Sequence, residues 1–214
     1  MRKLVIIFIF SSFFVNCLAQ HERGFQIWNK NEIVVRPWEK ISIEVAEKIH
    51  YSPEHGAAEV KYLELYLSHK PVNWLKYGAG FRGSKLNTYP EWIQENRPMI
   101  FADLLKNHKN FSFKYANRLE YRMFEFDKNH FRYRQEFLVE FPSLADWGMR
   151  FYTSEESFIK LNSNGLHLIR FYGGLSVVQI KHFKLKMFYA LEKLELIENW
   201  RTTDIAGINL SFII

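Results

Sequence analysis

The chain has almost no cysteine and no second long apolar segment. Cys17 is the one cysteine among 214 residues, and it lies in the apolar N-terminal stretch. If that stretch is removed, disulfides, iron–sulfur clusters and a cysteine nucleophile are excluded from the rest of the chain. A transmembrane helix needs about 20 consecutive apolar residues. No run after residue 19 has that length, and helical periodicity is weak throughout.

The excess of one sign of charge over the other is also small. Lys and Arg number 29 against 23 Asp and Glu, a formal net charge of +6, and bases and acids are interleaved. Nucleic-acid binding requires a one-sided basic patch, so we expect no nucleic-acid partner. The zinc-protease HExxH pattern, the nucleophile elbow and paired metal-ligand spacings are missing too. We therefore expect no metal and no cofactor.

The N-terminus has the layout of a secretory signal peptide. Arg2 and Lys3 precede a run of about a dozen apolar residues, too short to span a bilayer, and small residues precede a cleavage point after Ala19. We predict a signal peptide over 1–19 and a single domain over 20–214. Loss of Arg2 and Lys3 lowers the formal charge from +6 to +4.

What the chain has in abundance is alternation of apolar and charged residues. The clearest stretch runs from Asn110 to Phe141 with a polar break at 127–130. Side chains of a strand point alternately to opposite faces, so this stretch predicts two strands, each with one apolar and one charged face. Each is about a dozen residues long, roughly twice the usual strand length in soluble domains. Such strands are typical of a barrel with lipid on its outer wall.

The alternation recurs along the chain and divides it into eleven segments. They cover 25–35, 41–50, 62–67, 75–82, 99–106, 110–123, 131–141, 147–159, 166–178, 183–194 and 205–214. For segment 99–106 the sequence does not decide which side chains face outward. Single-chain bacterial barrels have even strand numbers, so either 25–35 is no wall strand or one strand is missing from this division. We predict an all-β, antiparallel transmembrane β-barrel of about 10–12 strands.

Several features favour the outer membrane of a bacterium with two membranes. Short connections near 70–73, 107–110 and 180–182 alternate with longer ones near 52–58, 87–96 and 197–203, as in outer-membrane barrels. Ile208, Leu210, Phe212 and Ile214 form a terminal amphipathic strand, the feature by which barrel-assembly machinery recognises its clients. We expect outer-membrane lipids and that machinery as partners, with the oligomeric state open. Aromatic residues suited to interfacial girdles are Trp38, Trp74, Tyr89 and Trp147.

The sequence resembles a family of exported bacterial proteins known as domain of unknown function 2490. The similarity is carried by Phe25-Gln26-Ile27-Trp28, by Glu95-Asn96-Arg97 and by the closing strand 205–210. It is also carried by the segments Arg118-Leu119-Glu120-Tyr121-Arg122 and Phe131-Arg132-Tyr133-Arg134. The resemblance implies an outer-membrane barrel and offers no catalytic residues.

The candidate site is a ladder of charged residues on the inward parity of two adjacent strands. Its members are Arg118, Glu120, Arg122, Arg132, Arg134 and Glu136. Cross-strand neighbours of opposite charge attract, so these residues either brace and fill the lumen or line a narrow pore that prefers anions.

Two alternatives stay open. A lipid hydrolase or acyltransferase needs a Ser–His or Asp–His pair at the lumen or rim, with Ser154, Ser157, Ser163 and Ser176 as candidates by residue type. The adjacent Glu155 and Glu156 are interpreted as a solvated rim. A soluble periplasmic ligand-binding barrel would turn its apolar parity inward. Whether the protein is an enzyme is left open, and a passive role is favoured.

Overall fold

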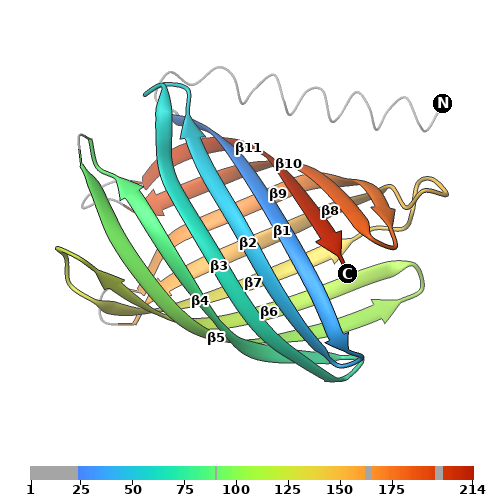
Figure 1. The fold of residues 1–214 in the computed structure, drawn as a ribbon. Coiled ribbons are helices and arrows are strands. Elements are labelled where there is room, and N and C mark those ends of the chain that lie inside the picture. Colours follow the sequence, from blue (N-terminus) through green and yellow to red (C-terminus); the bar gives the residue numbers. More distant parts are fainter. Residues whose placement is uncertain (1–23, 90, 162–164, 196–199) are drawn as a thin grey trace, which may run out of the picture.

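Eleven strands close into one tilted barrel in the computed structural model (Figure 1), which describes residues 24–89, 91–161, 165–195 and 200–214. The strands are β1 (Gly24–Trp38), β2 (Ile41–Ser52), β3 (Ala57–Val72), β4 (Leu75–Asn87), β5 (Trp92–His108), β6 (Phe111–Phe124), β7 (His130–Glu140), β8 (Arg150–Lys160), β9 (Gly165–Ile180), β10 (Phe183–Glu195) and β11 (Trp200–Ile213). The all-β barrel of 10–12 strands is confirmed. The signal peptide predicted over 1–19 lies outside the described residues.

The described ranges contain no helix with the length and apolar character needed to cross a membrane.

An odd number of strands closes the barrel through one parallel pair. Every other neighbour pair is antiparallel, whereas β1 and β11 run parallel from Gly24 opposite Thr203 to Val34 opposite Ile213. A parallel ladder also pairs backbone N–H and C=O groups, so closure leaves no open edge. The expectation of an even count was therefore wrong, and segment 25–35 is a full wall strand. As a result, the chain enters and leaves the barrel at opposite ends.

The two ends of the barrel differ in their connections. At the end where β11 finishes, here called the C-terminal end, connections 39–40, 73–74, 109–110 and 181–182 are tight, and 141–149 is longer. The opposite end, where β1 begins, carries connections 53–56, 88–91 and 125–129. The predicted long connection 87–96 was wrong, because β5 already begins at Trp92. Pro98 lies inside β5, where the ladder to β6 is interrupted between Asn96 and Met99.

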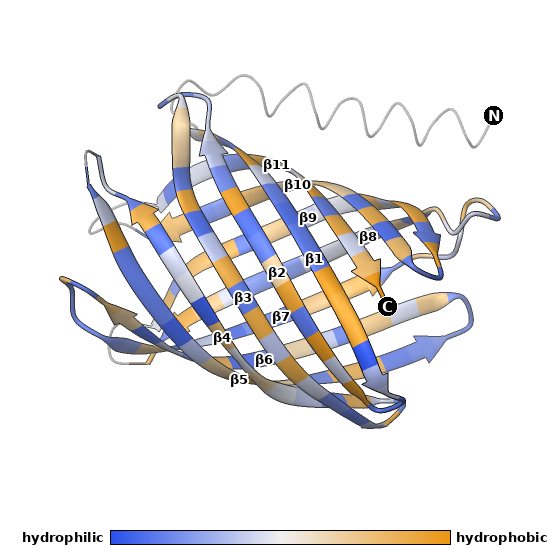
Figure 2. Ribbon diagram, in the orientation of Figure 1, coloured by the Kyte–Doolittle hydropathy of each residue, from blue (hydrophilic) through white to orange (hydrophobic). Residues whose placement is uncertain are grey.

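The apolar parity of the strands faces outward. In β3, Leu63, Leu65 and Leu67 are each more than half exposed, whereas Glu64 between them is buried. The alternation is visible along each strand in Figure 2. In β5, whose facing the sequence left open, Ile100 faces outward and Met99 inward. The soluble alternative requires the opposite arrangement, with apolar side chains inside.

Part of the interior is apolar. Trp28, Tyr152, Phe188, Ala190 and Ile205 form a buried cluster contributed by β1, β8, β10 and β11.

Two aromatic rings of this cluster each cover a glycine directly across the ladder. Gly207 lies opposite Phe188, and Gly174 lies opposite Tyr152. A Cβ added at Gly207 would lie 2.2 Å from the Phe188 ring, and one at Gly174 would lie 2.6 Å from the Tyr152 ring. Glycine at these positions allows the rings to lie flat on the inner wall.

Candidate lumen site

The barrel encloses a cavity of about 740 Å³ whose lining is strongly cationic. Its described lining contains fourteen Lys and Arg against eight Asp and Glu, a formal charge of 14 − 8 = +6. Glu120 and Glu140 also bind lining cations, and including them gives +4. The interior therefore carries a net positive charge equal to the formal charge of residues 20–214.

The structure brings part of the predicted ladder together. Glu120 lies directly opposite Arg132 across β6 and β7, whereas Arg118 lies opposite Arg134. Arg132 donates from Nε and Nη2 to one carboxylate oxygen of Glu120, at 2.9 and 2.6 Å. Both residues of this ion pair are buried. Arg118, Arg122, Arg132, Arg134 and Glu136 line the cavity.

Two residues that the sequence analysis left out of the ladder complete a buried cluster in the half of the lumen toward the start of β1. Glu95 accepts hydrogen bonds from Arg97 at 2.7 and 2.9 Å and from Arg122 at 2.6 and 3.1 Å. Arg97 also lies 3.4 Å from Glu120. Both glutamates have no exposed surface. We call these residues the arginine cluster: Glu95, Arg97, Glu120, Arg122 and Arg132.

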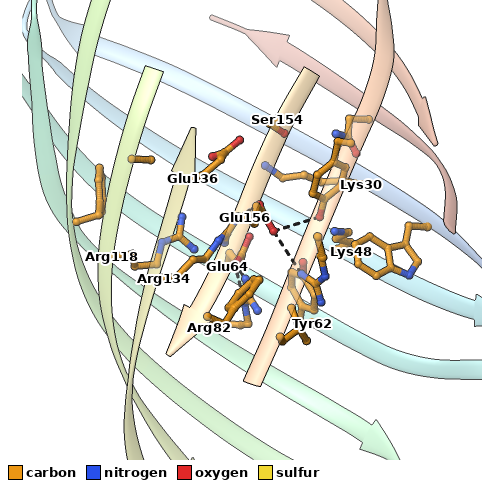
Figure 3. A pocket seen from close by; sticks show the side chains of 18 of the residues that line it. Lys30, Lys48, Tyr62, Glu64, Arg82, Arg118, Arg134, Glu136, Ser154 and Glu156 are labelled. Atoms are coloured by element: carbon orange, nitrogen blue, oxygen red, sulfur yellow. Dashed lines mark hydrogen bonds and ion pairs between the residues drawn. The ribbon is translucent and has the colours of Figure 1, made fainter. Parts of the chain in front are cut away.

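The like charges of Arg118 and Arg134 are separated by partners on other strands. Arg134 pairs with Glu156 of β8, and Glu156 also lies 3.5 Å from Arg170 of β9. Arg118 donates to the Tyr66 hydroxyl of β3 at 3.0 Å, across the lumen. Figure 3 shows Arg118, Arg134 and Glu156 among the side chains that line the cavity. Each of these two cations is therefore bound to a partner inside the barrel.

The adjacent acids in β8 point to opposite sides of the wall. Glu156 is buried in the lumen, whereas Glu155 accepts a hydrogen bond from Ser157. The interpretation of both as a solvated rim was therefore wrong for Glu156.

Toward the C-terminal end of the barrel, lysines replace arginines as the cations. Lys114 binds Glu136 at 2.7 Å. Lys186 and Lys184 lie 2.8 and 3.6 Å from Glu140. Their side chains are 18–31% exposed, whereas the three arginines of the arginine cluster are 5–16% exposed. We call these residues the lysine cluster: Lys114, Glu136, Glu140, Lys184 and Lys186.

The serines and histidines considered for hydrolysis are not brought together. In the part of the chain that the structure describes, no histidine ring nitrogen hydrogen-bonds to a serine hydroxyl. His167 Nδ1 and Ser176 Oγ are buried without a hydrogen-bond partner in the same ranges. Ser163 lies outside the described residues. No group of three metal-ligating side chains is found among the described residues.

Comparison with known proteins identifies a family and no closer relative. A family model described as "Protein of unknown function (DUF2490)" matches residues 25–203, which run from the start of β1 into β11. No curated protein and no solved structure matches the chain. The match covers most of the 214 residues and confirms the resemblance seen in the sequence. The chain belongs to the DUF2490 family.

Proposed function

We propose that this protein is an outer-membrane β-barrel that forms a narrow channel with a preference for anions. The observation that carries the proposal is a cationic lumen enclosed by an apolar outer wall. Lipid requires an apolar exterior and complete backbone pairing, and a closed barrel meets both demands. A lumen with surplus positive charge attracts anions and repels cations.

Exposed aromatic residues at both ends of the barrel support a membrane location. Trp38, Trp74 and Trp147 are 57–66% exposed at the C-terminal end, and Trp92 and Trp200 are exposed at the opposite end. Tryptophan concentrates at the boundary between lipid and water, so the two sets are suited to the two interfaces.

The spacing of these aromatic residues fits a bilayer. The Leu105 amide donates to the Trp74 carbonyl at 2.8 Å, so Leu105 lies beside Trp74. The stretch of β5 from Trp92 to Leu105 is about 43 Å long at about 3.3 Å per residue. A strand tilted by about 45° then covers a height of about 30 Å, close to an apolar band of about 25 Å with its girdles.

Polar side chains on the outer wall hydrogen-bond to one another. Tyr115 donates to Gln135 at 3.0 Å, and Tyr133 donates to Asn117 at 2.5 Å. These bonds lower the cost of placing polar groups against lipid.

Selectivity would arise from the surplus of cations rather than from the arginine ladder alone. The four ladder arginines hold Glu95, Glu120, Glu156 or Tyr66 and thereby brace the lumen. Among the described residues, Lys48, Lys76 and Lys160 line the cavity with no carboxylate within 4 Å, so they contribute to the unbalanced charge.

The test is the reversal potential of the purified, folded protein in a planar bilayer under a KCl gradient. We expect a potential of the sign set by chloride. The double variant Lys76→Gln/Lys160→Gln should reduce the preference, because it removes two lumen charges without leaving a carboxylate unpaired. Lys61→Gln/Lys85→Gln removes two exposed lysines of β3 and β4 that do not line the lumen and serves as the matched control. A cation-selective pore, or no conductance, would contradict the proposal.

A further inference from the structure

One lysine lies deep in the lumen on an aromatic ring instead of a carboxylate. The Lys48 ammonium of β2 lies 3.9 Å from the centre of the Trp28 ring and 6.0 Å from that of Tyr62. Among the described residues no carboxylate oxygen lies within 4 Å of it, whereas Lys114 and Lys186 each have one. An ammonium drawn into the interior needs anionic compensation, and a ring face supplies only part of it.

Position distinguishes Lys48 from the other lumen lysines that have no carboxylate within 4 Å. Lys160 is the last residue of β8 and lies at the end of the barrel. Lys76 lies near the start of β4, directly opposite Asp103 of β5. Lys48 is central in β2, and its cross-strand neighbours are Lys30 and Tyr62. Its charge therefore lies inside the lumen, away from both mouths.

Two further polar groups on the same inner wall as Lys48 lack protein partners among the described residues. His50 follows two residues later on the same face of β2 and is stacked on Trp28 at 3.9 Å. Ser84 lies opposite Tyr62, which in turn lies opposite Lys48. His50 Nε2 and Ser84 Oγ are buried without any hydrogen-bond partner in the described chain. Buried polar groups are normally hydrogen-bonded, so these two groups are available to hydrogen-bond to a solute in the lumen.

The nearby acids are already occupied. Glu64 accepts a hydrogen bond from Arg82 Nε at 2.6 Å. Glu156 is shared by Arg134 and Arg170. Both carboxylates are therefore bound by guanidinium groups, and neither forms an ion pair with the Lys48 ammonium. Figure 3 shows Lys48 and Tyr62 across the lumen from Arg134.

We propose that Lys48, His50, Tyr62 and Ser84, the anion corner, bind a compact tetrahedral oxyanion, either free or as the phosphoryl or sulfuryl group of a small solute. The corner offers an ammonium, a ring nitrogen and two hydroxyls on adjacent strands β2, β3 and β4. Such an anion has several oxygens and can accept hydrogen bonds from several donors at once. Hydrogen bonds to a charged group are stronger than those between neutral groups. The inference names a solute class for the channel proposed above and rests on that proposal for its role in transport.

Binding is measured on the full mature chain folded in detergent, by ³¹P NMR titration of inorganic phosphate with sulfate as competitor. We expect saturable binding that sulfate displaces and chloride at the same ionic strength does not. Lys48→Met should weaken it by about tenfold and Ser84→Ala by about fivefold, as expected for a charged and a neutral donor. Heat-dependent gel mobility of each variant verifies that it is folded.

The matched control is Lys114→Met, which removes one lysine from the same cavity but from a pair with Glu136. Its phosphate affinity should stay within about twofold of the parent. If Lys114→Met and Lys48→Met lose the same affinity, or if phosphate does not bind saturably, the anion corner is wrong and the lumen acts only as a diffuse positive charge.

Glycerol phosphate in a second titration separates the two sources of the anion. Binding of both compounds supports a site for phosphoryl groups of solutes, and binding of phosphate alone supports a site for the free ion. The two proposals can fail separately. Anion-selective conductance without phosphate binding overturns the anion corner alone, whereas phosphate binding without conductance overturns the channel alone.

Discussion

The arginine cluster and the lysine cluster occupy the two halves of one lumen. Both pair glutamates inside the barrel with cations, but they use different cations and differ in exposure. In the first, Glu95 and Glu120 have no exposed surface and are shared among Arg97, Arg122 and Arg132. In the second, Glu136 and Glu140 are each 14% exposed and are held by lysines.

The difference follows from the shape of the two cations. A guanidinium presents a planar fork of donors that can bind one carboxylate twice and another at the same time, whereas an ammonium is a compact and strongly hydrated charge. Guanidinium groups can therefore form a cluster that is cross-linked and excludes water, whereas ammonium groups retain water molecules around them. We infer that the arginine cluster stiffens and narrows the barrel and that the lysine cluster forms its wetter part.

The largest expected effect comes from removing a shared carboxylate. Glu120→Gln leaves Arg132 without a charged partner inside the barrel and leaves Arg97 with Glu95 alone. Breaking a buried pair in this way costs about 3–5 kcal/mol. Glu136→Gln leaves only the partly exposed Lys114 and should cost about 1 kcal/mol. Urea unfolding followed by tryptophan fluorescence in lipid vesicles measures both. Equal losses for the two variants would remove the distinction between the clusters.

A substitution in the apolar part of the inner wall provides a reference for these losses of unfolding free energy. Gly207→Ala would place a Cβ 2.2 Å from the Phe188 ring, and overpacking of this kind costs about 1–3 kcal/mol. The control is Gly173→Ala, since no atom lies within 4 Å of an added Cβ there. The same unfolding assay should place Gly207→Ala below Glu120→Gln in effect. A neutral Gly207→Ala would show that Phe188 is not fixed on the inner wall.

Reciprocal exchange of the two cations sharpens the comparison. Arg132→Lys loses one of two bonds to Glu120 and should lower the unfolding free energy by about 1–2 kcal/mol. Lys114→Arg retains its charge in the wetter half and should change stability by less than about 0.5 kcal/mol. If both exchanges cost the same, the fork geometry has no special role.

The smallest effect is the response to salt. The Debye length falls from about 10 Å at 0.1 M to about 3 Å at 1 M salt, and buried pairs are screened much less than exposed ones. High salt should therefore reduce the cost of Glu136→Gln and leave that of Glu120→Gln unchanged within about 0.5 kcal/mol. The measurement is the unfolding curve of each variant at both salt concentrations. Equal salt dependence would contradict a dry arginine cluster.

Local alternation was enough to predict the architecture from the sequence. Period two fixed the strands and grouped Arg118, Glu120 and Arg122 on one face, because side-chain direction is a property of the strand itself. The even strand count failed because closure depends on pairing between Gly24–Val34 and the other end of the chain, which no local pattern encodes.

The ion pairs could be predicted only where both partners lie on one hairpin. Glu120 and Arg132 are such neighbours. Glu95 was left out because 87–96 was predicted to be a connection, although Glu95-Asn96-Arg97 keeps the alternation and β5 begins at Trp92. Lys48 could not be singled out from the sequence, since the lack of a carboxylate near its ammonium depends on which residues of other strands surround it.

The most direct test of the account is the behaviour of the protein in cells that export it. Outer membranes are separated from soluble periplasmic protein, extracted with detergent and run on a gel with and without boiling. The account predicts that the protein is in the outer-membrane fraction and that its mobility changes on boiling, because a folded barrel resists the detergent. A soluble periplasmic protein with no change in mobility would contradict it, since the apolar wall would then face water.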